Sequence, residues 1–108
     1  MADSFKVLGQ SKPAGATLAD LYTVPAATSS TVSTINVCNQ GTATTFRISV
    51  APAGVADALT QYLVYDAPIL SNDSLPFTIG ITLATTDKIR VQSASGNVSF
   101  SAFGVEIT

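Results

Sequence analysis

The sequence predicts an all-β fold, an antiparallel β-sandwich or jelly roll of about eight strands. Three observations lead to this prediction. Apolar and polar residues alternate along several segments, valine and isoleucine outnumber leucine, and turn-forming residues separate the segments at intervals of about 8–12 residues. The chain is also 46% hydrophobic and only 11% charged. Because disordered chains combine low hydrophobicity with high charge, this composition favours a folded domain.

The predicted strands follow one another along a single domain, residues 1–108. We expect them at residues 4–10, 19–24, 31–39, 44–51, 60–70, 74–83, 87–93 and 97–107. Glycine, proline and asparagine residues mark the turns between them. Residues 1–11 are interpreted either as an N-terminal arm or as the first strand. Residues 51–59 allow at most a helical turn, since Pro52 and Gly54 oppose a longer helix.

Three of the predicted strands alternate regularly. Every second residue is apolar in residues 45–50, 75–83 and 87–92, which is typical of a strand buried on one face. The positions expected to face the core are Phe46, Ile48, Val50, Leu75, Phe77, Ile79, Ile81, Leu83, Ile89 and Val91. Lys88 and Arg90 lie between them and are expected to be solvated.

The third predicted strand contains an irregularity. Val32 does not share the parity of Ile35 and Val37, so the three side chains cannot face the same side of a regular strand. An extra residue in the strand would restore the common face. We therefore expect a bulge or a bend near Ser33.

Two other strands depart from simple alternation. In residues 97–107 the apolar parity changes at Ala102, which predicts a bend or a change of sheet at that position. Residues 62–65 are apolar on both parities. This second pattern predicts a strand that is covered on both sides.

The titratable residues exclude several classes of function. The chain has no histidine, which is the commonest general base and the commonest metal ligand, and its one cysteine, Cys38, excludes an internal disulfide and a Cys-rich zinc site. Five bases and seven acids are dispersed and give a net charge of −2, which does not indicate nucleic acid or a membrane as a partner. We expect no enzymatic activity, cofactor or metal. Cys38 is expected to be a buried, inert thiol.

The acidic residues have two interpretations. Two of them could converge as an acid–base pair, or they could accept backbone hydrogen bonds in turns, and the second role is favoured because most of them lie beside turn residues. Asn72, Asp73 and Ser74 offer oxygen ligands for a cation, but they lack a complete calcium-loop pattern. A turn is therefore the preferred interpretation there too.

Three tyrosines combine an apolar ring with a polar tip. Tyr22, Tyr62 and Tyr65 could line a sugar site or anchor a protein interface, and the alternative is a position at the core edge with the hydroxyl in water. The beginning of the chain has no long apolar run typical of a signal peptide. No segment reaches the length of a membrane span, which is roughly 18 apolar residues.

Several sequence segments of the chain resemble small β-sandwich virion structural proteins of tailed phages. They are residues 20–26 (DLYTVPA), 37–50 with VCN, Gly41 and TFRISV, 80–91 with GITL and IRV, and 100–107 (FSAFGVEI). The resemblance covers most of the chain from residue 6 onward. These phrases are strand and turn sequences, and they do not separate capsid decoration or cement proteins from neck or tail accessory proteins.

The resemblance implies a non-enzymatic protein of the virion, assembled in the host cytoplasm. Its partners would be the major capsid protein, or neck or tail proteins, together with copies of itself as a homo-oligomer. Phe5, Val7 and Leu8 would be apolar anchors toward a neighbour, and Tyr22, Tyr62 and Tyr65 would be further interface residues. A neck, tail or fibre component is the first alternative, and a carbohydrate-binding adhesive module that uses the tyrosines is the second.

Overall fold

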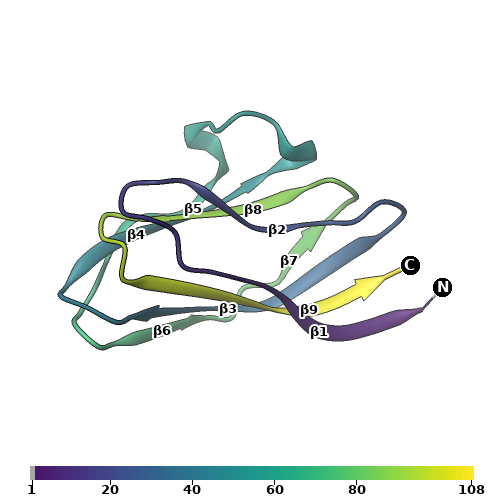
Figure 1. Cartoon of the computed structure of the whole chain (residues 1–108). Coiled ribbons are helices and arrows are strands. Elements are labelled where there is room, and N and C mark those ends of the chain that lie inside the picture. The colour runs from purple at the N-terminus through teal and green to yellow at the C-terminus, as the bar shows by residue number, and fades with distance from the viewer. Residues whose placement is uncertain (1) are drawn as a thin grey trace.

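Two antiparallel sheets pack face to face in the computed structural model, which describes residues 2–108 (Figure 1). The prediction of an antiparallel β-sandwich is confirmed. The described residues form nine strands: β1 (Asp3–Ser11), β2 (Ala19–Thr23), β3 (Ser29–Asn39), β4 (Thr44–Ala51), β5 (Tyr62–Ile69), β6 (Ser74–Phe77), β7 (Ile81–Leu83), β8 (Lys88–Ser93) and β9 (Val98–Ile107). Two 3₁₀ turns, η1 (Pro52–Gly54) and η2 (Leu59–Gln61), precede β5. No helix within residues 2–108 has the length and apolar character needed to cross a membrane.

The strand order places the two ends of the chain side by side. One sheet has the order β1-β9-β3-β6, with β7 also paired to β3, and the other has the order β2-β8-β4-β5. The first strand therefore pairs with the last, and both termini lie at the same end of the sandwich (Figure 1). Ala2 and Thr108 exchange two backbone hydrogen bonds of 3.0 Å, so the pairing continues beyond the ends of both strands.

The core lies between the sheets and contains the inward residues of both. Phe46 of β4 is its centre, because its ring makes edge contacts with Phe77 at 5.8 Å and with Phe100 at 6.1 Å between ring centroids. Aromatic pairs of this geometry contribute about 0.5–1.5 kcal/mol beyond the burial of their area. The alternation predicted for β8 is confirmed, since Ile89 and Val91 are fully buried.

The irregularity expected in the third strand is present. The register of β3 against β9 shifts between Val32 and Thr34, which leaves Ser33 as the extra residue. Val32, Ile35 and Val37 are consequently all buried on the same face. The bulge predicted near Ser33 is confirmed, and hydrophobic burial explains it, because a regular strand would have turned Val32 toward solvent.

The strand predicted over residues 74–83 is instead two strands. β6 pairs with Ile35–Cys38 of β3, and β7 pairs with Ser30–Val32, so the interruption lies opposite the bulge of β3. Because the bulge breaks the ladder, one continuous strand cannot follow β3 on this side. Ile79 falls in the interruption and is 39% exposed, so its predicted inward position was wrong.

Strand β5 is an edge strand and is not covered on both sides. Leu63 and Tyr65 are 48% and 51% exposed, whereas Ile69 at the other end of the strand is buried. The expectation for residues 62–65 was wrong because apolar residues on both parities do not reveal whether a second layer covers the outer face. The helical turn allowed over residues 51–59 is present as η1, and it extends no further than Gly54.

Strand β9 directs the same alternate residues into the core along its whole length. Val98, Phe100, Ala102 and Glu106 are all buried, while Phe103 on the other parity is 38% exposed. β9 therefore stays in one sheet between β1 and β3, and the change of sheet predicted as one of two outcomes at Ala102 was wrong. Gly104 also has the inward parity, at a point where the backbone of β3 comes very close. A Cβ atom on Gly104 would lie 2.1 Å from the carbonyl oxygen of Thr31.

This close approach predicts that Gly104→Ala destabilises the fold. We expect the free energy of unfolding in urea to fall by about 1–3 kcal/mol, because β3 or β9 must move to admit one methyl group. Gly80→Ala is the matched control, since a Cβ at Gly80 meets no atom within 4 Å. It should change stability by less than about 0.5 kcal/mol. Equal effects of the two substitutions would contradict the packing described for Gly104.

Candidate interaction surfaces

Tyr22 lies in the interior, where it joins the two sheets. Its hydroxyl is 2.6 Å from Ser30 Oγ and donates a hydrogen bond of 2.5 Å to Glu106 Oε2. Glu106 Oε1 is 2.5 Å from Nζ of Lys6. Tyr22 belongs to β2 of one sheet, whereas its partners Ser30 and Glu106 belong to β3 and β9 of the other, and Lys6 belongs to β1 of that same sheet. With 7% of its surface exposed, Tyr22 is not a residue of the outer surface.

The environment of this cluster fixes the protonation of its members. Burial, followed by the bond to Glu106, raises the pKa of Tyr22 to about 12. The pKa of Glu106 is lowered, first by the hydrogen bond with Lys6 and then by the bond from Tyr22. A protonated phenol and an ionised carboxylate whose two oxygens are both bound form a stable bridge. The cluster acts as a polar link between the two sheets, with the partly exposed Lys6 on its solvent side.

An apolar strip crosses the outer face of β1 and β9. Phe5 is 81% exposed and Val7 is 50% exposed, and they lie opposite Val105 and Phe103 in the β1–β9 register. A shallow groove of about 380 Å³ runs along the strip, with Thr31, Ser33, Lys6 and Gly104 as its remaining walls. Isolated exposed apolar residues are common, but a contiguous group on one face is typical of an interaction site.

The three N-terminal residues expected to be anchors do not act together. Phe5 and Val7 share the outer strip, whereas Leu8 is partly buried and packs against the core. A shift of register between Val7 and Gly9 separates them, because it leaves Leu8 as the extra residue of β1. Residues 3–11 form a strand of the sheet, so the outer surface at this end is built by β1 and β9 together.

Tyr62 and Tyr65 form a second surface cluster, on the edge strand β5. Their rings are 5.1 Å apart in an edge-on arrangement. The guanidinium of Arg47 lies 4.1 Å from the centroid of Tyr65 and 6.0 Å from that of Tyr62. Tyr62 also donates a hydrogen bond of 2.9 Å to Asp57. The structure thus brings these two of the three predicted tyrosines together and places Tyr22 elsewhere.

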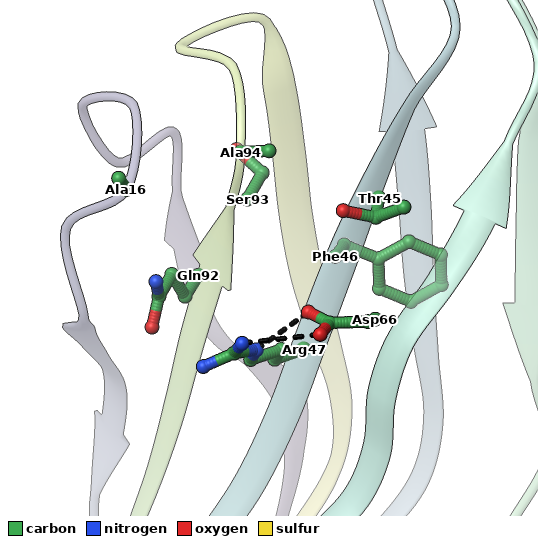
Figure 2. A pocket seen from close by; sticks show the side chains of 8 residues that line it. All are labelled: Ala16, Thr45, Phe46, Arg47, Asp66, Gln92, Ser93 and Ala94. Atoms are coloured by element: carbon green, nitrogen blue, oxygen red, sulfur yellow. Dashed lines mark hydrogen bonds and ion pairs between the residues drawn. The ribbon is translucent and has the colours of Figure 1, made fainter.

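Arg47 is held by Asp66 beside a small cavity (Figure 2). Nε of Arg47 donates to one carboxylate oxygen at 2.6 Å, and Nη2 donates to the other at 3.1 Å. In the register of β4 and β5, two residues of β5, Tyr65 and Asp66, lie opposite the single residue Arg47, which makes a β-bulge. Asp66 has a φ of 52°, and this backbone geometry directs its carboxylate onto the guanidinium. The cavity has a volume of about 220 Å³, and its further walls include Thr45, Phe46 and Gln92.

Sequence reasoning missed both ion-paired clusters. Asp66 was predicted only as part of the strand over residues 60–70, and no specific role was predicted for Glu106. The pairings join residues 19 positions apart in one cluster and as many as 100 in the other. No local spacing signals such contacts, because they depend on which strands become neighbours.

Several of the remaining titratable residues are engaged in structural contacts. Lys88 and Arg90 were expected to be solvated, but they pair with Asp20 at 2.8 Å and 3.4 Å. Asp87 accepts backbone hydrogen bonds from Ala53 and Ala84, and this is the turn role that the sequence favoured for its acids. Within residues 2–108 no three His, Cys, Asp or Glu side chains are grouped so that they could hold a metal ion.

Cys38 differs from the expectation of a buried thiol. It is half-buried, because its side chain has the outward parity of β3 between the buried residues Val37 and Asn39. The inward parity of this strand is occupied by the apolar core residues.

Asp73 accepts a hydrogen bond of 2.9 Å from the backbone N–H of Ser74, which agrees with the turn interpretation of residues 72–74.

Comparisons with known proteins identify the fold. No family model and no curated protein sequence matches the chain. Among solved structures, a chain in the structure of infectious bursal disease virus, Gx strain, superposes with a TM-score of 0.54 at 12% sequence identity. The match covers 97% of this chain and 31% of the viral chain, so the protein spans about a third of the length of that neighbour. The similarity is one of fold.

The interior position of Tyr22 predicts that removing its hydroxyl lowers the stability of the fold. Tyr22→Phe should lower the free energy of unfolding by about 1–3 kcal/mol, because Ser30 and Glu106 each lose a buried hydrogen-bond partner. Tyr65→Phe is the control, since Tyr65 is half-exposed, and it should change stability by less than about 0.5 kcal/mol. Denaturant titration of the three proteins measures both values. A neutral Tyr22→Phe would show that the bridge contributes nothing to stability.

The lowered pKa of Glu106 predicts acid sensitivity. A carboxyl group whose pKa is lower in the folded state stabilises the fold above its ordinary pKa, here 4.5, and this contribution is lost as the pH falls through the folded value. Glu106→Gln should therefore be less stable than the natural chain at neutral pH and should lose less further stability on acidification. Some dependence on pH remains, because pairing with Lys88 and Arg47 also lowers the pKa values of Asp20 and Asp66.

The measurement is the free energy of unfolding as a function of pH from neutral to acidic conditions. Asp3→Asn is the matched control, since it removes one exposed carboxylate that forms no ion pair within the described residues. Its pH profile should follow that of the natural chain. Identical profiles for Glu106→Gln and the natural chain would contradict the role assigned to the Lys6–Glu106–Tyr22 cluster.

Proposed function

We propose that this protein is a non-enzymatic structural component of a phage virion, most specifically a decoration or cement protein that binds the outside of the head. The main support is the sandwich fold itself, which matches a chain of a virus structure over 97% of its own length. The sequence phrases that resemble small virion proteins of tailed phages support the same proposal. The paired and hydrogen-bonded titratable groups also fit it, because they stabilise strands and turns.

The proposed mechanism is thermodynamic linkage. A protein that binds the assembled head lattice, and not the separated capsid subunits, shifts the equilibrium toward the assembled state. Each contact can be weak, because a lattice repeats the same site many times and multiple attachment increases the overall affinity. A small rigid sandwich suits this role, since little conformational entropy is lost when it binds.

The outer strip of Phe5, Val7, Phe103 and Val105 is the surface that we assign to the head. It is apolar and lies on two paired strands, so its shape is maintained by the sheet. Polar residues of the groove, Thr31 and Ser33, border it on the β3 side. An apolar centre with a polar border is the common arrangement of protein interfaces.

A neck, tail or fibre component remains the alternative and differs in copy number. Quantitative mass spectrometry of purified virions, made by the phage that encodes this chain, should find it in an amount comparable to the major capsid protein. A much smaller amount, matching the few copies that the one tail of each particle can hold, would support the alternative. Absence of the protein from purified virions would contradict both.

Binding to the head can be tested with particles that lack the protein. Purified protein should bind these particles and raise the temperature at which they release their genome, whereas Phe103→Ser should bind at least about tenfold more weakly, as expected when an apolar anchor of an interface is removed. Leu63→Ser is the matched control, because Leu63 is also exposed but lies on the other sheet. Thermal melting of each variant establishes that it is folded. Equal binding by both variants would exclude the outer strip as the attachment surface.

A further inference from the structure

Strand β1 has a free edge along its first half. Within the described residues β1 pairs with β9 alone, and Asp3, Ser4, Phe5, Lys6 and Val7 are all exposed. Ala2 and Thr108 form a hydrogen-bonded pair, so the alternation of an antiparallel ladder assigns the next bonds to Ser4 and Lys6. The backbone N–H and C=O groups of the intervening residues point away from β9. They form a row of unused donors and acceptors.

The other edges of the two sheets carry features that prevent strand pairing. β5 is interrupted by two shifts of register and contains Pro68; β6 contains Pro76 and ends after four residues, and β7, which also pairs with β3 alone, has only three residues. β2 lies against β1 at Gly9, where a Cβ atom would be 2.0 Å from the carbonyl oxygen of Leu21. Bulges, proline, short length and covering are among the devices by which proteins protect an edge; lysine is another, but Lys6 of β1 is paired with Glu106 of its own chain. Residues 3–7 have no proline, no glycine and no shift of register.

We propose that this protein forms a two-fold symmetric dimer in which the free edges of two β1 strands pair antiparallel and join two copies into one continuous sheet. The inference is independent of head binding. The partner at this edge is a second copy of the chain, because the unused backbone donors and acceptors of one β1 strand match those of another β1 strand in antiparallel orientation. A two-fold axis at Phe5 places Asp3 opposite Val7 of the second copy, and each such pair can exchange two backbone hydrogen bonds.

The charges of the strand select this register. A two-fold axis at Lys6 would place two lysines directly opposite each other, which is unfavourable in a sheet. With the axis at Phe5, Lys6 lies opposite Ser4 of the second copy, and its ammonium group remains bound to Glu106 of its own chain. A register with the axis at Ser4 would leave the backbone groups of Val7 unused. The register at Phe5 therefore gives the most hydrogen bonds without opposing like charges.

The symmetry of this contact limits the assembly to two copies. An isologous contact uses the same surface on both partners, so it closes when the second copy has bound. The other edges are protected, and a growing sheet is therefore not expected. In the dimer the two Phe5 side chains become neighbours on the same outer face, where they join the two apolar strips.

Light scattering coupled to size-exclusion chromatography over a range of concentrations tests the dimer. The natural chain should change from monomer to dimer as the concentration rises. Phe5→Pro should weaken the association by roughly tenfold or more, because it removes two symmetry-related hydrogen bonds at the axis. The substitution preserves the β1–β9 ladder, since the N–H of Phe5 points to the free edge. Phe5→Ala keeps that N–H and should weaken the association less.

Hydrogen exchange of the natural chain gives a test that needs no variant. The amides of Phe5 and Val7 should exchange rapidly in dilute protein and slowly in concentrated protein, whereas those of Ser4 and Lys6 should be protected at both concentrations. A monomer at every concentration overturns the proposal. So does a dimer in which the amides of Phe5 and Val7 still exchange rapidly, or a dimer that a folded Phe5→Pro variant forms with unchanged affinity.

Discussion

The alternation of β9 is the constraint on which the rest of the structure depends. This strand lies between β1 and β3 and keeps one set of side chains in the core from Val98 to Glu106. A strand in a half-buried sheet cannot change its face without a bulge, because side chains alternate strictly. The choice of inward parity therefore brings a carboxylate into the interior at one end and turns Phe103 and Val105 to the outside. The interior bridge and the outer strip are two results of the same alternation.

An interior carboxylate is tolerated because its partners are already in place. Lys6 belongs to the strand that pairs with β9, and Tyr22 reaches Glu106 from the opposite sheet. Buried charge is costly unless it is both paired and hydrogen-bonded, and Glu106 meets both conditions. The cluster also links the first, second, third and last strands, so it holds together the end of the sandwich where the two termini meet (Figure 1). The outer strip lies on this same end, and its geometry is maintained from within.

Part of the molecular surface is protected against pairing with another chain, and part of it is free to make such contacts. Most sheet edges are interrupted, shortened or covered, and most charged side chains are paired. What remains available is the first half of β1, with an apolar strip on its face and unused backbone groups on its edge. A chain that offers contacts of this kind is suited to assembly with neighbours, which is the physical basis of the proposed role in a virion. The paired tyrosines and Arg47 on β5 form a separate surface, where the bidentate ion pair with Asp66 orders the side chains.

The sequence by itself determined the all-β class, the approximate positions of the strands and the bulge at Ser33, because these depend on local alternation and on turn residues. It did not determine the parity of β9, the division of residues 74–83 or the exposure of β5. Those features depend on which strands are neighbours and on whether a second layer covers a face. Glu106 is the clearest case: its sequence position indicates an outward polar residue, and only contacts with Lys6 and Tyr22, which are far away in the chain, make the inward position favourable. Tertiary structure decided these points because the energy of a buried polar group is set by its partners, and local sequence does not specify them.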